Sequence, residues 1–140
     1  MTAQMTVEQA NARAQGHFPG HLGIEFTGVA PRDIRAVMPV KSELMAPNGY
    51  LHAGAVVTLA DTCAGFGCMA SLPEGATGFT TIELKSNFLG TTRDGTLACH
   101  ATLVHGGRTT QVWDATVTHE ETGKTLALFR CTQLLLYPKS

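Results

Sequence analysis

The sequence predicts an α+β domain in which a five- or six-stranded antiparallel sheet wraps around one long helix. Two observations predict this fold: an apolar segment at residues 51–72, and runs of β-favouring residues on both sides of it. The chain has 140 residues, 44% of them hydrophobic, and a domain of about this size buries roughly 68–70% of its unfolded surface. No repeat or linker interrupts the sequence, so we expect residues 1–140 to form a single domain.

The first expected elements are a short helix and two strands. Thr6-Val7-Glu8-Gln9 has the form of a capping box, and the Ala-rich stretch behind it reaches Gly16, which predicts a helix over about residues 6–16. Residues 23–29 and 34–40 are expected as strands on either side of the turn at residues 31–33.

The second half of the chain predicts strands throughout. Residues 80–89 alternate with the period of a strand that has one covered face: Ile82, Leu84, Ser86 and Phe88 on one side, Thr81, Glu83, Lys85 and Asn87 on the other. Further strands are expected at residues 96–104, 109–118 and 125–136. Because the intervening Asp94-Gly95, Gly106-Gly107 and Thr122-Gly123 are hairpin signals, we expect an antiparallel meander.

The apolar segment at residues 51–72 is expected to be a core helix. A transmembrane helix is the alternative, but Asp61 lies in the middle and neither end carries a flanking Lys or Arg. A helix that is apolar all round is typically surrounded by protein. Small residues let a curved sheet approach the helix backbone closely, and the segment carries Ala53, Gly54, Ala60, Gly65 and Gly67.

Charge and motif spacing exclude several classes of function. The chain carries 10 Lys and Arg against 11 Asp and Glu, and the basic residues are scattered singly, so we expect no nucleic-acid partner. His100, His105 and His119 have no metal-ligand spacing, so we expect solvated strand or turn positions and no metal site.

Cysteine usage and the N-terminus indicate the compartment. No cysteine pair has C-x-x-C spacing, and a domain this apolar needs no disulfide framework, so we expect free, mostly buried thiols at Cys63, Cys68, Cys99 and Cys131. No apolar run follows a basic start at residues 1–16, so no signal peptide is predicted. We expect a cytoplasmic protein that does not bind membranes.

Asp61 is the most informative position. An ionised carboxylate inside an apolar helix costs several kcal/mol unless it is paired or reaches solvent, and no Lys or Arg lies within a turn or two of it. One interpretation is a catalytic carboxylate. The structural alternative is an Asp that bonds to Thr58 or Thr62, or that faces water.

The start of the same helix offers hydrogen-bond donors. His52, Ala53 and Gly54 begin it, and the first N–H groups of a helix point outward with partial positive charge, which suits a developing oxyanion. The alternative is that Asn48 or His52 simply caps the helix.

The spacing of these two features predicts a dimer. His52 and Asp61 are nine residues apart, which at ~100° and ~1.5 Å per residue places them on opposite sides of the helix and roughly 13 Å apart along it. One helix cannot bring both to one carbonyl group. If they act together, the helix start of one chain must face Asp61 of a second chain across a twofold axis.

The motif resembles a known family. Asn48-Gly49-x-x-His52-Ala53-Gly54, followed by Leu59-Ala60-Asp61 and Gly65, is similar to the signature of hotdog-fold acyl-CoA thioesterases, close to the phenylacetate-degradation type. The similarity runs from about residue 22 to residue 136 and includes the turn at residues 105–108 and Gly123-Lys124.

The resemblance implies roles for individual residues. Asp61 is implied as general base or nucleophile, Asn48 as the group that positions the thioester or water, and the N–H of Ala53, with Gly54, as the oxyanion hole at the helix start that His52 begins. Thr81 is implied as a hydroxyl near the attacking water and Arg108 as a contact to a phosphate of coenzyme A, with Thr62 and Phe88 as further substrate contacts. Ala53 stands where the family commonly has Gly, which affects the fit of the acyl group but retains the backbone donor.

We therefore expect an aryl- or medium-chain acyl-CoA thioesterase that needs no cofactor, since coenzyme A is part of its substrate, and that forms dimers and, as dimers of dimers, tetramers. A hotdog dehydratase or hydratase is one alternative, because His52 with Asp61 resembles a His–acid pair. His17-Phe18-Pro19-Gly20 also resembles the dehydratase loop, although it precedes the first strand rather than the central helix. A non-catalytic acyl-CoA-binding module is the other alternative, but binding alone gains nothing from a buried carboxylate.

Overall fold

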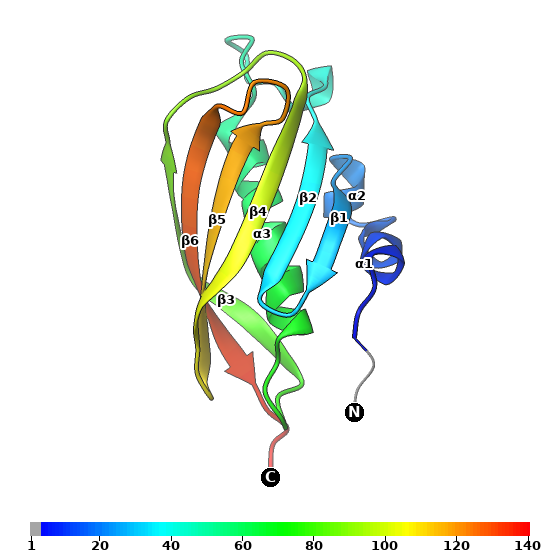
Figure 1. Ribbon diagram of the computed structural model, residues 1–140, viewed down its shortest axis with the longest axis vertical. Helices are drawn as coiled ribbons and strands as arrows, with labels where there is room; N and C mark the ends of the chain where they lie inside the picture. Colours follow the sequence, from blue (N-terminus) through cyan, green and yellow to red (C-terminus); the bar gives the residue numbers. More distant parts are fainter. Residues whose placement is uncertain (1–3) are drawn as a thin grey trace.

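A six-stranded antiparallel sheet curves around one long helix, α3 (Ala53–Ala70), in the computed structural model, which describes residues 4–140 (Figure 1). The strand order is β1-β2-β4-β5-β6-β3. The strands are β1 (Glu25–Ala30), β2 (Asp33–Pro39), β3 (Gly78–Phe88), β4 (Thr96–Gly106), β5 (Thr110–His119) and β6 (Thr125–Leu136). The expected fold class is confirmed.

The N-terminal helix α1 (Val7–Ala14) packs against the edge of the sheet. Its capping box is present: Gln9 N donates to Thr6 Oγ1 at 3.1 Å, and Thr6 N donates to Gln9 Oε1 at 2.9 Å. Asn11 holds α1 to β1, because its side chain bonds to both the N–H and the carbonyl oxygen of Phe26. A four-residue helix, α2 (Phe18–His21), and the 3-10 turn η1 (Ser42–Leu44) were not predicted.

The predicted four-stranded meander is wrong in one connection. Strands β4, β5 and β6 do form a meander, but β3 pairs with β6 and β4 pairs with β2. The Asp94-Gly95 segment therefore closes no hairpin. The loop before β4 is instead held at one end of the sheet, because Leu51 N donates to Thr92 O and Val40 N donates to Gly95 O.

A bulge in β3 changes which of its side chains face the helix. The register with β6 shifts between Thr81 and Glu83, so Ile82 is left without a partner and is 56% exposed. Directly paired residues share a face, and Thr81 is paired with the buried Gln133. The uniform alternation predicted for this strand is therefore wrong at Thr81 and Ile82, because the extra residue reverses the faces on one side of it.

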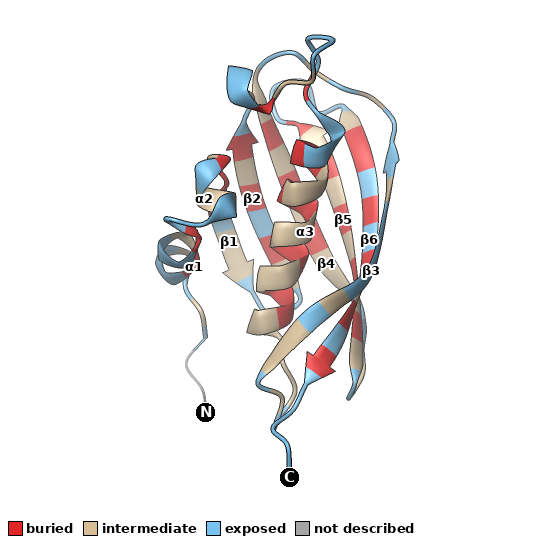
Figure 2. Cartoon of the chain, turned by 180° about the vertical axis from the view of Figure 1, so that it is seen from behind, coloured by how far each residue is buried: buried red, intermediate tan, exposed pale blue. Residues whose placement is uncertain are grey.

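Helix α3 is covered on one side only. The residues toward the sheet are buried, including Leu59, Ala60 and Cys63, whereas the opposite side is half-exposed (Figure 2). By length and composition α3 could cross a membrane, but it contacts all six strands as the core helix of this sheet. We expected protein to surround the helix, but this chain covers only one face of it. Ala53 and Gly54, which we expected to lie against the sheet, are exposed.

Gly67 is the point of closest approach between α3 and the sheet. A Cβ atom there would lie 2.5 Å from the ring of Trp113, which is fully buried. We expect Gly67→Ala to lower the free energy of unfolding by about 1–3 kcal/mol through overpacking, although alanine is the better helix former by about 1 kcal/mol. Urea unfolding followed by circular dichroism measures it. Gly78→Ala is the control, because a Cβ there would meet nothing within 4 Å, and equal stability of the two variants would contradict the prediction.

The predictions for the cysteines and for the histidines have different outcomes. All four cysteines are free and buried, as expected. His119 contradicts the expectation of a solvated position: it is 8% exposed, and its ring bonds to Asp94 O and Thr122 Oγ1, which joins the loop before β4 to the turn before β6. Within residues 4–140, no cluster of three or more His, Cys, Asp or Glu residues is placed to hold a metal ion.

Candidate active site

Asp61 lies on the half-exposed side of α3 with a carboxylate oxygen that has no partner. Its Oδ1 is buried and accepts no hydrogen bond within the described chain. Thr58 does not supply one, because its hydroxyl donates to Gly54 O at 2.8 Å. Among residues 4–140 no Lys or Arg forms an ion pair with Asp61. Burial therefore raises the pKa of Asp61 above its usual range without an opposing charge.

The carboxylate is carried by a helix that packs against β3 and β6. Burial raises the pKa of the Cys131 thiol to about 12, and the charge of nearby Asp61 adds to this effect. Cys131 is fully buried on β6 and is paired with Leu84 of β3. One turn along α3 from Asp61, the Phe79 ring of β3 lies over Gly65. Ser86, two residues after Leu84 and on the same face of β3, has a second buried oxygen, Oγ, without a hydrogen-bond partner in residues 4–140.

The start of α3 has one free donor rather than two. His52 is the N-cap, and its Nδ1 accepts from Gly54 N at 2.7 Å. The N–H groups of Ala55 and Val56 donate to His52 O. No acceptor for Ala53 N lies in the described part of the chain. Of the predicted pair, Ala53 presents its N–H outward and Gly54 does not.

The same contact sets the chemistry of His52. Because Nδ1 accepts a hydrogen bond, the neutral ring carries its proton on Nε2, which then is a donor. A Cβ at position 54 would lie 2.9 Å from His52 Nδ1, so the His52 ring can hold this position only next to a glycine. His52 pairs with no carboxylate among the described residues.

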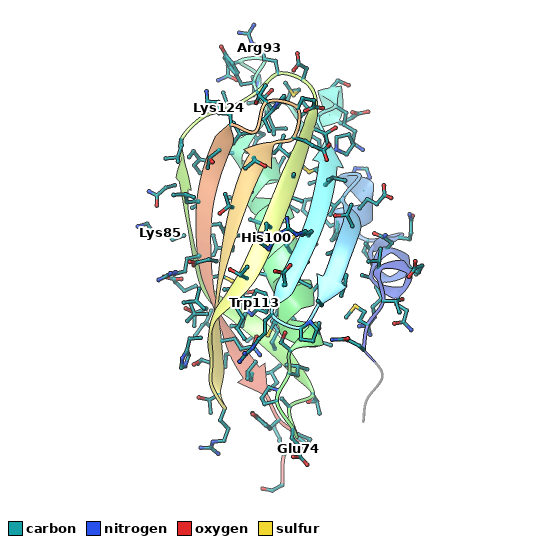
Figure 3. All side chains as sticks on the ribbon, viewed as in Figure 1. Glu74, Lys85, Arg93, His100, Trp113 and Lys124 are labelled. Carbon is teal, nitrogen blue, oxygen red and sulfur yellow. The ribbon has the colours of Figure 1, made fainter. Side chains whose placement is uncertain are left out.

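Asn48 lies in the exposed turn before the helix. Its Oδ1 accepts from Tyr50 N at 3.1 Å, so the side-chain oxygen shapes the turn. The Arg93 guanidinium stacks over the Tyr50 ring at 4.3 Å, a contact that sequence reasoning missed because the two residues meet only through loop packing. Figure 3 shows Arg93 and Lys124 at the end of the molecule where α3 begins.

Thr81 faces the helix side of the sheet because of the bulge. Its hydroxyl donates to Gln133 Oε1 at 2.6 Å, and Gln133 Nε2 donates to Cys131 Sγ at 3.5 Å. Thr81 is thus held to β6 through two buried side chains, those of Gln133 and Cys131. Sequence reasoning did not single out Gln133; the feature that could have revealed it is a polar residue at an inward-facing, otherwise apolar position of β6.

The remaining predicted residues lie apart. Thr62 is half-exposed beside Asp61 on α3, and Phe88 is 46% exposed at the end of β3. Arg108 lies in the turn between β4 and β5, where its carbonyl oxygen accepts from the Tyr137 hydroxyl. That turn is at the end of the sheet opposite the start of α3 (Figure 1). One chain alone does not bring Arg108 to the helix start.

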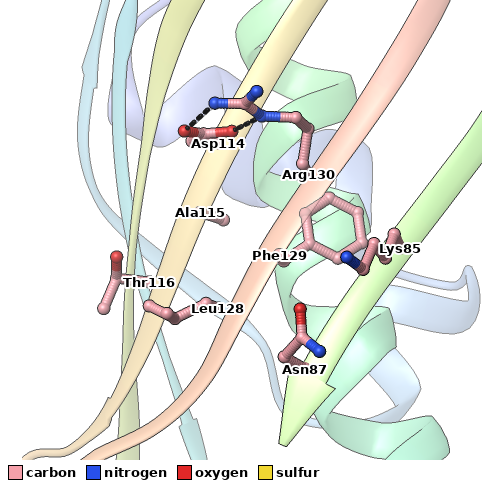
Figure 4. Close-up of a pocket in the computed structure, with 8 residues that line it drawn as sticks. All are labelled: Lys85, Asn87, Asp114, Ala115, Thr116, Leu128, Phe129 and Arg130. Atoms are coloured by element: carbon pink, nitrogen blue, oxygen red, sulfur yellow. Dashed lines mark hydrogen bonds and ion pairs between the residues drawn. The ribbon is translucent and has the colours of Figure 1, made fainter.

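A separate hollow lies on the outer face of the sheet, away from α3 (Figure 4). Its lining includes an ion pair in which Arg130 donates to both carboxylate oxygens of Asp114, at 2.5 and 2.8 Å. This pairing raises the pKa of Arg130. The hollow contains none of the predicted site residues, and its guanidinium is already neutralised.

Comparison with known proteins assigns the class. A sheet wrapped around a central helix defines the hotdog fold, and residues 48–126 match the family model described as thioesterase superfamily. The chain belongs to this superfamily, and it is a thioester hydrolase.

Relatives and solved structures agree over nearly the whole chain. A putative esterase of Haemophilus influenzae is 34% identical over 116 residues, 83% of each chain. The 1,4-dihydroxy-2-naphthoyl-CoA hydrolase of Escherichia coli is 31% identical over 136 residues, 95% of this chain and 96% of that protein. A crystal structure of a mutant of thioesterase PA1618 from Pseudomonas aeruginosa superposes with a TM-score of 0.90 at 30% identity, covering 97% of each chain.

Proposed function

We propose that this protein hydrolyses an aryl- or medium-chain acyl-CoA thioester to the free acid and coenzyme A, with Asp61 as general base or nucleophile. The observation that carries the proposal is the buried, unpartnered carboxylate oxygen of Asp61 on the uncovered side of α3. Such a group costs stability in the free protein, so it is explained by a partner that arrives with the substrate or the attacking water.

The arrangement can carry out the hydrolysis without further groups. As general base, Asp61 takes a proton from water while the water oxygen bonds to the thioester carbon. The carbonyl oxygen becomes an oxyanion that accepts from the Ala53 N–H. The oxyanion then re-forms the carbonyl, the C–S bond breaks, and the thiolate of coenzyme A takes the proton that Asp61 received, which returns Asp61 to its ionised form. A raised pKa of Asp61 makes it a stronger base than an ordinary Asp.

The two halves of this site come from two chains in our proposal. Strand β3 is an edge strand with unpaired backbone groups, and it exposes Ile82, Leu84 and Phe88. When two β3 edges pair antiparallel about a twofold axis, the end of one protomer at which α3 begins lies beside the opposite end of its partner. The start of one α3 then approaches Asp61 of the partner. We propose further that these dimers pair into tetramers in the cytoplasm, whose reducing conditions suit four free thiols.

The acyl group is proposed to be aromatic first and a medium alkyl chain second. Half-buried Phe66, Met69 and Phe79 lie on or beside the uncovered side of α3, and the Phe79 ring lies over Gly65. The Escherichia coli relative is named for a naphthoyl-CoA substrate. A screen of aryl- and straight-chain acyl-CoAs, with thiol release as the readout, tests this. Hydration of an enoyl-CoA, or binding without turnover, would contradict a thioesterase activity here.

Arg108 is proposed to contact a phosphate of coenzyme A. Antiparallel pairing brings its turn to the side of the dimer where the partner's α3 begins. We expect Arg108→Ala to raise KM for acyl-CoA more than it lowers kcat, because a remote phosphate contact binds substrate and transition state alike. Steady-state kinetics measures both. Arg32→Ala, at another exposed turn, is the control, and an unchanged KM in the Arg108 variant would remove Arg108 from the site.

A further inference from the structure

Gln133 is a buried polar residue on the inner face of β6 whose side chain holds two others. It is fully buried. Its Oε1 accepts from the Thr81 hydroxyl at 2.6 Å, and its Nε2 donates to Cys131 Sγ at 3.5 Å. Both ends of the amide are therefore occupied, which fixes its orientation between β3 and β6.

The direction of these bonds determines what Thr81 can still do. A threonine hydroxyl has one proton and two lone pairs. Since the proton is given to Gln133 Oε1, the hydroxyl keeps only its acceptor capacity. Cys131 keeps a neutral sulfur that can accept from Gln133, because burial and the neighbouring Asp61 raise the pKa of its thiol to about 12.

Two acceptors lie where β3 packs on α3. The Phe79 ring of β3 lies over Gly65, one turn along α3 from Asp61. Thr81 is the next inward-facing residue of β3 after Phe79, and its hydroxyl bonds to Gln133. A water molecule that donates one proton to a carboxylate and the other to a hydroxyl oxygen has its remaining lone pairs directed away from both. This orientation is the one that a nucleophilic water needs toward a carbonyl carbon.

We propose that Gln133 is a positioning residue, which holds the Thr81 hydroxyl as a hydrogen-bond acceptor so that Thr81 and Asp61 together orient the attacking water. The inference rests on the proposed function. Without the Gln133 amide, the Thr81 hydroxyl is free to rotate and can present its proton instead of a lone pair to the water. The water then loses one of its two fixed contacts, whereas substrate contacts are unaffected.

The matched control is Gln111, which lies directly opposite Gln133 on β5. It is 1% exposed and bonds to Ser71 O and to the Trp113 indole, but not to Thr81. We expect Gln133→Met and Gln111→Met each to lower thermal stability. Only Gln133→Met should lower kcat, by about tenfold with KM little changed. An equal loss of kcat in both variants would overturn the positioning role.

A double-mutant cycle tests whether Gln133 acts through Thr81. Thr81→Val removes the hydroxyl at nearly constant volume, and we expect Gln133→Met to reduce kcat no further in that background. Additive losses would overturn the inference. If Gln133→Met does not fold, Gln133→Asn, which is one methylene too short to reach Thr81, replaces it with the same expectation.

The outcomes separate the two proposals. Normal turnover in Asp61→Asn would remove the proposed function itself. An inactive Asp61→Asn together with additive Thr81 and Gln133 effects would leave that function standing and reject only the positioning role.

Discussion

Asp61→Asn should lower kcat by at least about 10²-fold while the protein remains folded. Asparagine keeps the shape of the side chain but can neither take a proton from water nor attack the thioester. Single-turnover and steady-state assays of thiol release measure the effect. Asp114→Asn is the control, because Asp114 lies on the outer face of the sheet in a pair with Arg130, and its kcat should be close to that of the wild type.

The same substitution should raise the thermal stability at neutral pH. Burial raises the pKa of Asp61, so the folded protein binds this proton more tightly than the unfolded chain does. As pH rises from the unfolded pKa through the raised folded pKa, this contribution to stability is lost. Asparagine has no such ionisation. A lower melting temperature for Asp61→Asn, with its kcat unchanged, would contradict both parts of the assignment.

The pH profile follows from the same shift. The ionised form is the active base, so the acid limb of kcat/KM should lie at a higher pH than an ordinary Asp would give.

Mixing two inactive variants should restore about a quarter of the wild-type activity, if each site combines the α3 start of one chain with Asp61 of its partner. The variants are Asp61→Asn and Ala53→Pro. Proline deletes the Ala53 N–H, and it suits this position, because Ala53 is the first residue of α3 and His52 before it is extended, with φ −66° and ψ 134°. In a mixed dimer one site carries both lesions and the other carries neither. With random pairing half the dimers are mixed, and each has one intact site of two.

Coexpression with two different affinity tags isolates the mixed dimer, whose activity should be about half that of the wild type because one of its two sites is intact. Ala53→Ser is the matched control for the proline variant, since it keeps the backbone donor. No recovery in mixed dimers that mass spectrometry shows to be intact, with each variant folded, would mean that both groups act within one chain. The shared-site geometry would then be wrong.

Local features were predictable because their causes lie within a few residues. The capping box at Thr6 and Gln9 needs only side chains three positions apart, and the extent of α3 follows from a continuous apolar segment that ends before Pro73. The isolation of Asp61 was also visible in the sequence, because a lone carboxylate in such a segment has no local partner. These features needed only helix periodicity and the cost of burying charge.

Features that depend on distant strands were decided by the tertiary structure. Strand β3 lies at the sheet edge beside β6, 37 or more residues away in sequence, and its bulge turns Thr81 inward; neither pairing nor register is encoded in the alternation of residues 80–89. The Gly54 N–H is not free to bind an oxyanion because it donates to His52 Nδ1, and this bond depends on the rotamer of the His52 side chain. The sequence therefore determined which groups are available for catalysis, and the packing of distant segments decided which of them are free to act, because hydrogen-bond partners are allocated only when the sheet closes around α3.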